Sequence, residues 1–285
     1  MDSDIFGALA VRENGVSITP TAPKPRQVLA LLVLHADRFV PADTLVEELW
    51  GQHPPCSARP TLQTYVLQLR ELITAALRLD PPGAPPRTAK DVLLTLPGGY
   101  LLKADGGVHA AQEFQRLIGM GHRAMDAEDH IAAEKLLSEA LSLWTGPPLP
   151  EITPGEHLGR VITKLEEDRL CALDRRVDVD LRLGRHRELL GELSVLVSRY
   201  PQHESLCGQY MLALHRSGRR SEALDAYRRL RDTLVGTLGI EPSLDLAKLQ
   251  QAILRAGTAV AAPPRPHRAD SRVRLQPDSR RASHP

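Results

Sequence analysis

Apolar residues recur along the first hundred positions in blocks, and their spacing predicts short strands followed by helices. Residues 4–20 alternate weakly around Asn14-Gly15, a pair typical of hairpin turns, so we predict two short strands there. Residues 26–36, RQVLALLVLHA, are apolar on nearly every side and predict a buried helix that opens at Pro23. The N-terminal segment is therefore a small sheet leading into a core helix.

Two further helices follow. The stretch DRFVPADTLVEELW predicts a short extended piece and then a helix, with Asp43 as its N-cap, Glu47 near the capping-box position and Gly51 at its end. Residues 57–73, SARPTLQTYVLQLRELI, predict an amphipathic helix with Pro60 in its first turn. Its apolar residues recur at three- and four-residue spacings, at Leu62, Tyr65, Val66, Leu69, Leu72 and Ile73.

The other face of that helix has an unusual composition. An ordinary solvated helix carries Glu and Lys there, but this one carries Gln63, Thr64, Leu67, Gln68 and Arg70. Gln, Thr and Arg side chains can discriminate the hydrogen-bonding edges of base pairs, and an apolar side chain can meet a thymine methyl group. The composition favours a nucleic-acid reading surface, although similar helices also occur on ordinary protein surfaces.

A second hairpin completes the first domain. After the proline-rich DPPGAPPRTA, the stretch DVLLTLPGGYLL predicts two apolar strands around Pro97-Gly98-Gly99. Strands, three helices and a hairpin are the order of a winged helix-turn-helix. In that fold the third helix enters the major groove and the hairpin contacts the DNA backbone or minor groove.

From residue 109 to residue 256 the pattern predicts helices only. Gly184-Arg185 and Gly218-Arg219 open two similar segments 34 residues apart, and residues 127–144 carry a related pattern. A helical period of 34 residues is the signature of tetratricopeptide repeats, which leave a concave surface for a partner. We expect Trp144 in the core, together with a set of repeat positions, Leu181, Leu189, Leu193, Leu196, Leu212, Leu214, Leu224, Tyr227 and Leu230.

The composition narrows the functional classes. The formal charge is only +1, and residues 1–103 carry 10 basic and 10 acidic side chains, so a nucleic-acid surface must be local. Residues 55–103 hold six Lys and Arg against three Asp and Glu. The sequence has no signal peptide, no apolar run long enough to span a bilayer, and no metal-ligand, hydrolase or nucleotide motif. We therefore expect a cytoplasmic, nucleoid-associated protein that is not an enzyme and holds no cofactor or metal, with reduced cysteines.

Several stretches together resemble one family. APKPRQVLALLVLHADRFVPADTLVEELWG, PPCSARPTLQTYVLQLREL and LPGGYLL resemble the OmpR-type DNA-binding domain of the Streptomyces antibiotic regulatory proteins. EALSLWTGPPLPEI and the repeat segments resemble the bacterial transcriptional activation domain of the same family. The resemblance divides the chain into a winged-helix domain (1–104) and an all-α tetratricopeptide-like domain (105–257). Residues 258–285 hold five prolines, six arginines and few large apolar residues, so we expect a disordered Pro/Arg-rich tail there.

The resemblance also implies partners and site residues. Family members activate biosynthetic operons by binding promoter direct repeats and recruiting RNA polymerase, so we expect double-stranded DNA, RNA polymerase holoenzyme and a homodimer on DNA. The expected DNA-binding residues are Arg59, Thr61, Gln63, Thr64, Tyr65, Gln68, Arg70, Arg87, Lys90, Gly98, Gly99 and Tyr100. The expected polymerase-contact loop consists of Gly51, Gln52, His53, Pro54, Pro55, Cys56 and Ser57.

Some of these assignments have alternatives. Tyr65 borders the apolar stripe, so a packing role is as plausible as a phosphate contact, and Gly98 and Gly99 fit turn formation better than ligand binding. Pro60 departs from the family, where many members carry a polar residue able to contact DNA. A protein-interaction adaptor that uses the helical domain is the competing function, and a repressor with the same DNA-binding chemistry is another. Retention on duplex DNA that falls steeply with salt would favour the DNA-binding readings.

Overall fold

Two three-stranded antiparallel sheets lie in the N-terminal part of the chain. The structure is a computed structural model that describes residues 1–79, 86–104 and 106–256. The first sheet has the order β1-β2-β3 and is built from Asp2–Asp4, Ala10–Glu13 and Val16–Ser17. The second sheet has the order β4-β6-β5 and is built from Phe39–Pro41, Gly99–Leu102 and Leu93–Leu96.

The predicted first hairpin is confirmed. Asn14 and Gly15 join β2 to β3 with positive φ angles of 50° and 77°, the backbone that a tight hairpin requires and that Asn and Gly tolerate best. The strand β1 adds a third member that the weak alternation did not reveal as separate. It pairs antiparallel with β2, with Ser3 opposite Val11.

Four helices belong to this part, namely α1 (Pro23–Leu34), α2 (Ala42–Trp50), α3 (Ala58–Leu77) and the short α4 (Ala89–Val92). The expected N-cap of α2 is wrong: Pro41 precedes the helix, and Asp43 lies within its first turn. The exposed Asp43 carboxylate instead pairs with Arg59 at 2.7 Å. The helix α4 was not predicted from the sequence, and Thr88 caps it through a reciprocal bond with Asp91.

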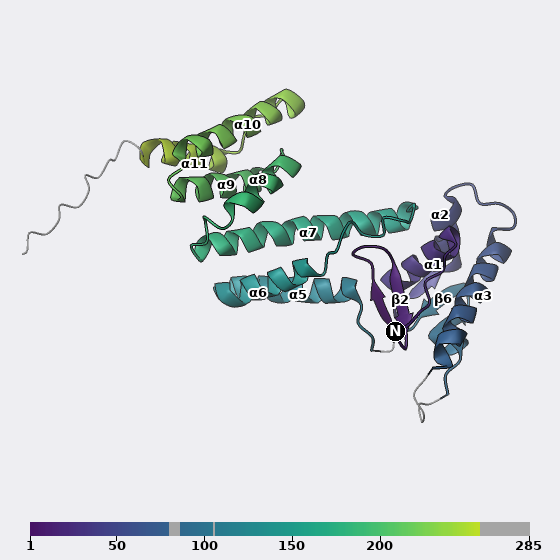
Figure 1. The fold of residues 1–285 in the computed structure, drawn as a ribbon. Helices are drawn as coiled ribbons and strands as arrows, with labels where there is room; N and C mark the ends of the chain where they lie inside the picture. The colour runs from purple at the N-terminus through teal and green to yellow at the C-terminus, as the bar shows by residue number, and fades with distance from the viewer. Residues whose placement is uncertain (80–85, 105, 257–285) are drawn as a thin grey trace, which may run out of the picture.

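The rest of the described chain is helical, as the pattern predicted, and the expected disordered tail lies outside the described residues. The helices are α5 (Ala110–Asp126), α6 (His130–Ser142), α7 (Glu156–Arg182), α8 (Leu190–Arg199), α9 (Glu204–Arg216), α10 (Arg220–Leu238) and α11 (Leu244–Ala256). The chain is thus mainly α-helical, with a winged helix-turn-helix followed by a tetratricopeptide-like array (Figure 1).

The turns before α6, α8 and α10 share one geometry, which supports the predicted repeat. Gly184 and Gly218 have φ angles of 83° and 82°, and Glu128 takes the same left-handed region at 59°. In each turn the next backbone N–H bonds back to a carbonyl of the preceding helix, as Arg185 does to Asp180 at 3.0 Å. Of the expected core positions only Leu212 and Leu224 stay partly exposed, and both pack against buried clusters.

One hydrophobic core spans the winged helix and the first helices of the array. Phe6, from the loop after β1, stacks on Trp144 with ring centroids 4.2 Å apart. Phe114 of α5 meets both rings edge-on, at 5.2 and 5.3 Å. Trp144 is 8% exposed, so its predicted place in the core is confirmed. This packing places α3 at one end of the molecule and α10 and α11 near the other (Figure 1).

Candidate nucleic-acid interface

The helix-turn-helix consists of α2, the loop 51–57 and α3. Leu29 and Leu32 of α1 are fully buried among residues of α2 and α3, so the three helices share one core. Every residue of the loop is exposed, and Gly51 ends α2 with a φ of 64°. The expected polymerase-contact loop is therefore accessible along its whole length.

The two faces of α3 separate as the sequence predicted. Leu62, Val66, Leu69 and Ile73 are at most 2% exposed and point into the core. Gln63, Thr64, Leu67 and Gln68 are exposed, and Leu67 has 57% of its surface free although it is apolar. We call these four residues the α3 reading face. A large exposed apolar side chain between two glutamines fits a surface that a partner covers.

Within the described residues, neither glutamine of the α3 reading face has an intramolecular hydrogen-bond partner. Thr64 donates its hydroxyl proton to the carbonyl of Pro60, at 3.2 Å, so the threonine is partly engaged by its own helix. The amide donor and acceptor atoms of both side chains are therefore free to form two hydrogen bonds with one base edge.

Arg70 has an intramolecular partner that the sequence did not reveal. Its Nε and Nη2 donate to the carbonyl oxygen of Leu93 at 3.1 and 2.6 Å, and Nη2 also reaches the Thr95 hydroxyl at 2.8 Å. Leu93 and Thr95 lie on β5, the first strand of the wing. Arg70 therefore joins α3 to the wing and constrains the angle between these two elements.

The residues that flank the α3 reading face have mixed surroundings. Tyr65 is partly buried, and its ring stacks on Trp50 with centroids 6.5 Å apart, which favours the packing role. Thr61 is partly exposed in the first turn, where its backbone N–H bonds to the Ser57 carbonyl. Arg59 is exposed, and its ion pair with Asp43 is a surface contact of low expected strength.

The wing corrects two of the expected DNA contacts. Gly99 and Tyr100 are buried on β6, which pairs with β4 on one edge and β5 on the other. A Cβ at Gly99 would overlap the backbone oxygen of Val40, so glycine is required there for close strand packing. Pro97 and Gly98 form the exposed tip, and the Gly98 φ of 83° identifies it as a turn former.

The two basic residues near the wing, Arg87 and Lys90, differ in their interaction partners. Arg87 donates to the buried Glu13 carboxylate at 2.8 Å, which places its guanidinium against the first sheet. Lys90 is exposed on α4 and has no hydrogen-bond or ion-pair partner among the described residues. Lys90 thus remains available for a phosphate, whereas Arg87 already neutralises a buried charge.

A second set of residues connects the helix-turn-helix to the helical array. Glu48 of α2 is 3% exposed, and its carboxylate accepts bonds from the backbone N–H groups of Gly155, His157 and Leu158 at 2.6 to 3.0 Å. These groups open α7, so the carboxylate caps a helix of the other domain, where the helix dipole also favours it. Gln27 of α1 donates to the same carboxylate at 2.8 Å.

Sequence reasoning missed Glu48, although one signal was present. It stands three residues after Leu45 and next to Leu49, both buried, which is a core-facing position for α2. A carboxylate at such a position requires buried hydrogen-bond donors, because an unpaired buried charge is very costly. The sequence could not name the backbone donors of α7, since they lie more than a hundred residues away.

The described residues contain no group of three or more His, Cys, Asp or Glu side chains placed to hold a metal ion. None of the helices in the described ranges has the length and apolar character needed to cross a bilayer.

Comparisons with known proteins agree with this architecture. Residues 17–80 match the family described as transcriptional regulatory protein, C terminal, and residues 111–254 match the family described as bacterial transcriptional activator domain. The first match covers α1 to α3, and the second covers nearly the whole helical array. Their order along the chain is the order of the two structural parts.

Individual relatives are similar over most of the chain. The regulatory protein DnrI of Streptomyces peucetius is 48% identical over 260 residues, covering 91% of this chain and 94% of DnrI. The transcriptional regulator RedD of Streptomyces coelicolor is 32% identical over 263 residues, covering 92% of this chain and 73% of RedD. The solved structure of Mycobacterium tuberculosis EmbR in complex with a low affinity phosphopeptide superimposes with a TM-score of 0.80 at 32% identity.

Other relatives are longer. The alignment covers 90% of this chain but 65% of the EmbR chain, and only 25% of the regulatory protein AfsR of Streptomyces griseus, at 32% identity. The shared part is the winged helix together with the helical array.

Proposed function

The chain belongs to the Streptomyces antibiotic regulatory protein family, and on this premise we propose how it acts as a DNA-binding transcriptional activator. It binds direct repeats in the promoter of a biosynthetic gene cluster through the α3 reading face and recruits RNA polymerase through the loop 51–57. The observation that carries the proposal is the exposed, unpaired pair of glutamines around Leu67 on the second helix of a helix-turn-helix.

Sequence choice would come from the α3 reading face. Gln63 and Gln68 suit adenine, whose N6 and N7 atoms match an amide donor and acceptor, and Leu67 suits a thymine methyl group. Arg59 and Lys90 are exposed cations that would meet phosphates on either side and supply salt-dependent affinity. Arg70 acts in this proposal as a positioning residue, because its guanidinium holds the wing.

Recruitment of polymerase is assigned to the loop 51–57. The loop is fully exposed between α2 and α3, so it would project from a DNA-bound helix-turn-helix without burying the reading face. Two copies on tandem repeats would present two such loops on the same side when the repeats are spaced by whole helical turns. Such a protein works as a dimer on the chromosome, within the nucleoid, and it needs no catalysis, cofactor or metal.

A gel-shift on the promoter regions that flank the gene tests the proposal. The purified protein is assayed at two salt concentrations, with unlabelled nonspecific DNA as competitor. We expect a discrete complex that resists the competitor, and Gln68→Ala should weaken it. Gln251→Ala, an exposed glutamine on α11, is the matched control and should bind like the wild type.

The competing function makes a different prediction for the same experiment. An adaptor that uses only its helical array would give no complex, or a smear that modest salt abolishes equally for all variants. Either result would reject the α3 reading face as a base reader. A repressor would also form the discrete complex. Transcription from the bound promoter in vitro therefore distinguishes activation from repression, and we expect activation.

A further inference from the structure

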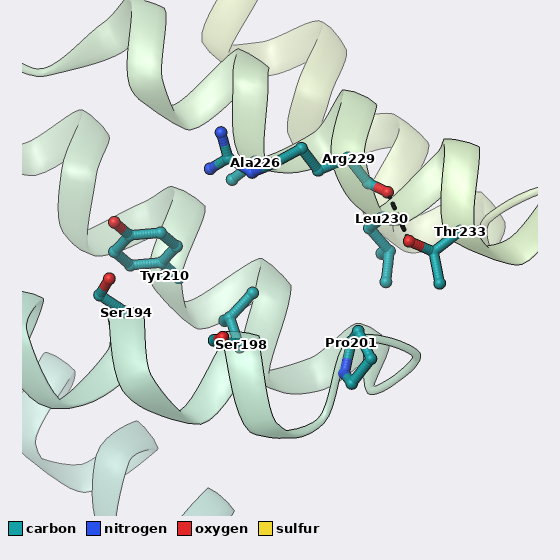
Figure 2. Close-up of a pocket in the computed structure, with 9 residues that line it drawn as sticks. Ser194, Ser198, Pro201, Tyr210, Ala226, Arg229, Leu230 and Thr233 are labelled. Atoms are coloured by element: carbon teal, nitrogen blue, oxygen red, sulfur yellow. Dashed lines mark hydrogen bonds between the residues drawn. The ribbon is translucent and has the colours of Figure 1, made fainter.

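A hollow of about 400 Å³ lies between α8 and α10, with α9 behind it. Figure 2 shows Ser194 and Ser198 on α8 and Arg229 and Leu230 on α10, on opposite sides of the opening. We call this hollow the α8–α10 groove. It is lined by Ser194, Val197, Ser198, Pro201, Tyr210, Ala226, Arg229, Leu230 and Thr233.

The repeat geometry explains why a groove forms there. Each of the two helices follows a turn of the same kind, at Gly184 and at Gly218, so α8 and α10 occupy the same position in consecutive repeats. In such arrays each repeat packs only against its neighbours, and the hollow lies where these two equivalent helices face each other. The groove lies away from α3, near the opposite end of the molecule (Figure 1).

The polar groups of the groove are donors without internal acceptors. Within the described residues, the Arg229 guanidinium forms no ion pair, although it interacts electrostatically with Glu222 outside the groove. The hydroxyls of Tyr210, Ser194 and Ser198 make no intramolecular hydrogen bond there. No Asp or Glu lines the groove. The hydroxyl of Thr233 differs, because it donates to the backbone carbonyl of Arg229 at 2.9 Å.

Two neighbouring arginines on α10 form ion pairs with carboxylates. The lack of such an ion pair at Arg229 is therefore not common to all arginines of this helix. Arg228 bonds to Asp225 at 2.7 Å, and Arg231 forms a two-pronged pair with Glu241 at 2.5 and 2.6 Å. Arg229 alone of these three lines the groove. A guanidinium that makes no ion pair and lies beside free hydroxyls, in a groove lined by no carboxylate, can bind a carboxylate from outside.

The remaining lining is apolar. Leu230 is 3% exposed and Ala226 is 1% exposed, and together with Val197 and Pro201 they form a floor beside the polar groups. A ligand that matches both parts carries a carboxylate and an adjacent apolar side chain. A segment of protein with acidic and apolar residues in alternation has this composition.

We propose that the α8–α10 groove is the docking site for an extended acidic segment of a partner protein. A Glu or Asp carboxylate of the segment pairs with Arg229 and accepts a hydrogen bond from Tyr210, while a neighbouring apolar side chain packs on Pro201 and Leu230. This assignment goes beyond DNA recognition and does not depend on it, because no residue of α3 or of the wing takes part.

The test uses the full chain and a fluorescein-labelled synthetic peptide of alternating glutamate and leucine, with binding followed by fluorescence anisotropy. We expect saturable binding that added salt weakens. Arg229→Gln should lose about tenfold in affinity, the cost of one charge-assisted contact. Arg228→Gln, one residue away and facing Asp225, is the matched control and should bind the peptide like the wild type.

Two further comparisons sharpen the result. A peptide with glutamine in place of glutamate should not bind, and Tyr210→Phe should weaken the glutamate peptide by less than Arg229→Gln does. The proposal is overturned by absent binding, by equal binding of the glutamine peptide, or by equal losses in the two arginine variants. Promoter binding by Arg229→Gln should match the wild type, so failure here is distinguishable from failure of the DNA-binding proposal.

Discussion

The carboxylate of Glu48 accepts a hydrogen bond of 2.6 Å from the backbone N–H of Gly155, and this contact joins α2 of the winged helix to the start of α7. Glu48 also receives bonds from His157, Leu158 and Gln27. A buried carboxylate with four donors fixes the helix-turn-helix rigidly to the helical array. Besides the shared hydrophobic core, this polar junction holds the two parts together, and its residues can be changed singly.

Glu48→Gln should loosen this junction. The amide can accept fewer of the backbone N–H bonds, and loss of a hydrogen bond to a charged group costs about 1.5–3 kcal/mol. The free energy of unfolding, measured by urea denaturation, should fall by that order. Cleavage of the segment 146–155 by a protease at low concentration should become faster. Unchanged stability and unchanged cleavage would contradict the role given to Glu48.

Gly155→Ala tests the same junction from the other side. A Cβ at Gly155 would overlap the backbone oxygen and the carboxyl carbon of Glu48, so α2 and α7 must separate to accommodate it. Gly146→Ala is the matched control in the same connecting segment, because nothing lies within 4 Å of a Cβ placed there. We expect a lower melting temperature for the first variant and little change for the second.

Arg70 should act on DNA affinity through the wing. Arg70→Gln removes the bonds to the Leu93 carbonyl and to Thr95, so the wing is no longer held against α3. We expect weaker promoter binding with an unchanged sequence preference, and a smaller loss for Thr95→Val, which removes one bond only. A changed preference at one base position would instead make Arg70 a reader of that base.

The buried His109 should make the free energy of unfolding depend on pH. Burial lowers the pKa of His109 below 6.5, so the unfolded chain binds more protons than the folded chain just below that value. Its contribution to stability is complete above pH 6.5 and is lost as pH falls toward the folded pKa. His109→Asn should flatten the slope of unfolding free energy against pH there. Burial also lowers the pKa of His122, which accounts for a remaining slope.

The three cysteines should differ in reactivity. Cys56 and Cys171 are exposed, whereas burial raises the pKa of Cys207 to about 12, so little of its thiolate forms near neutrality. Two thiols should react quickly with a chromogenic disulfide, and the third only after unfolding.

The exposed Cys56 also offers a test of the loop 51–57. In the variant Cys171→Ser, a bulky maleimide labels Cys56 within this loop. Labelling should block activation in vitro while promoter binding persists, and unaffected activation would reject the polymerase contact.

Local patterns in the sequence predicted the elements well. The apolar stripe of α3, the Asn14-Gly15 turn and the 34-residue period each depend on residues close together in the chain, and the structure contains all three. The expected N-cap of α2 was wrong because Pro41, with a φ of −58°, ends the preceding strand and takes the N-cap position two residues before Asp43.

Contacts between distant elements could not be predicted. Tyr100 carries a polar hydroxyl in a predicted wing, and only the central position of β6 reveals that it faces the core. The partners of Arg70 and Glu48 lie 23 and 107 residues away. Spacing along the chain identifies a face or a turn, but it does not identify which distant backbone group a side chain will meet.

The central claim is that the α3 reading face chooses the DNA sequence, and a binding selection from a randomised promoter library tests it most directly. Wild-type protein and Gln68→Ala are each used to select and sequence bound DNA. We predict that the variant loses preference at one base position in each direct repeat, while the other positions and the repeat spacing stay the same. Identical selected sequences for the two proteins would contradict the claim.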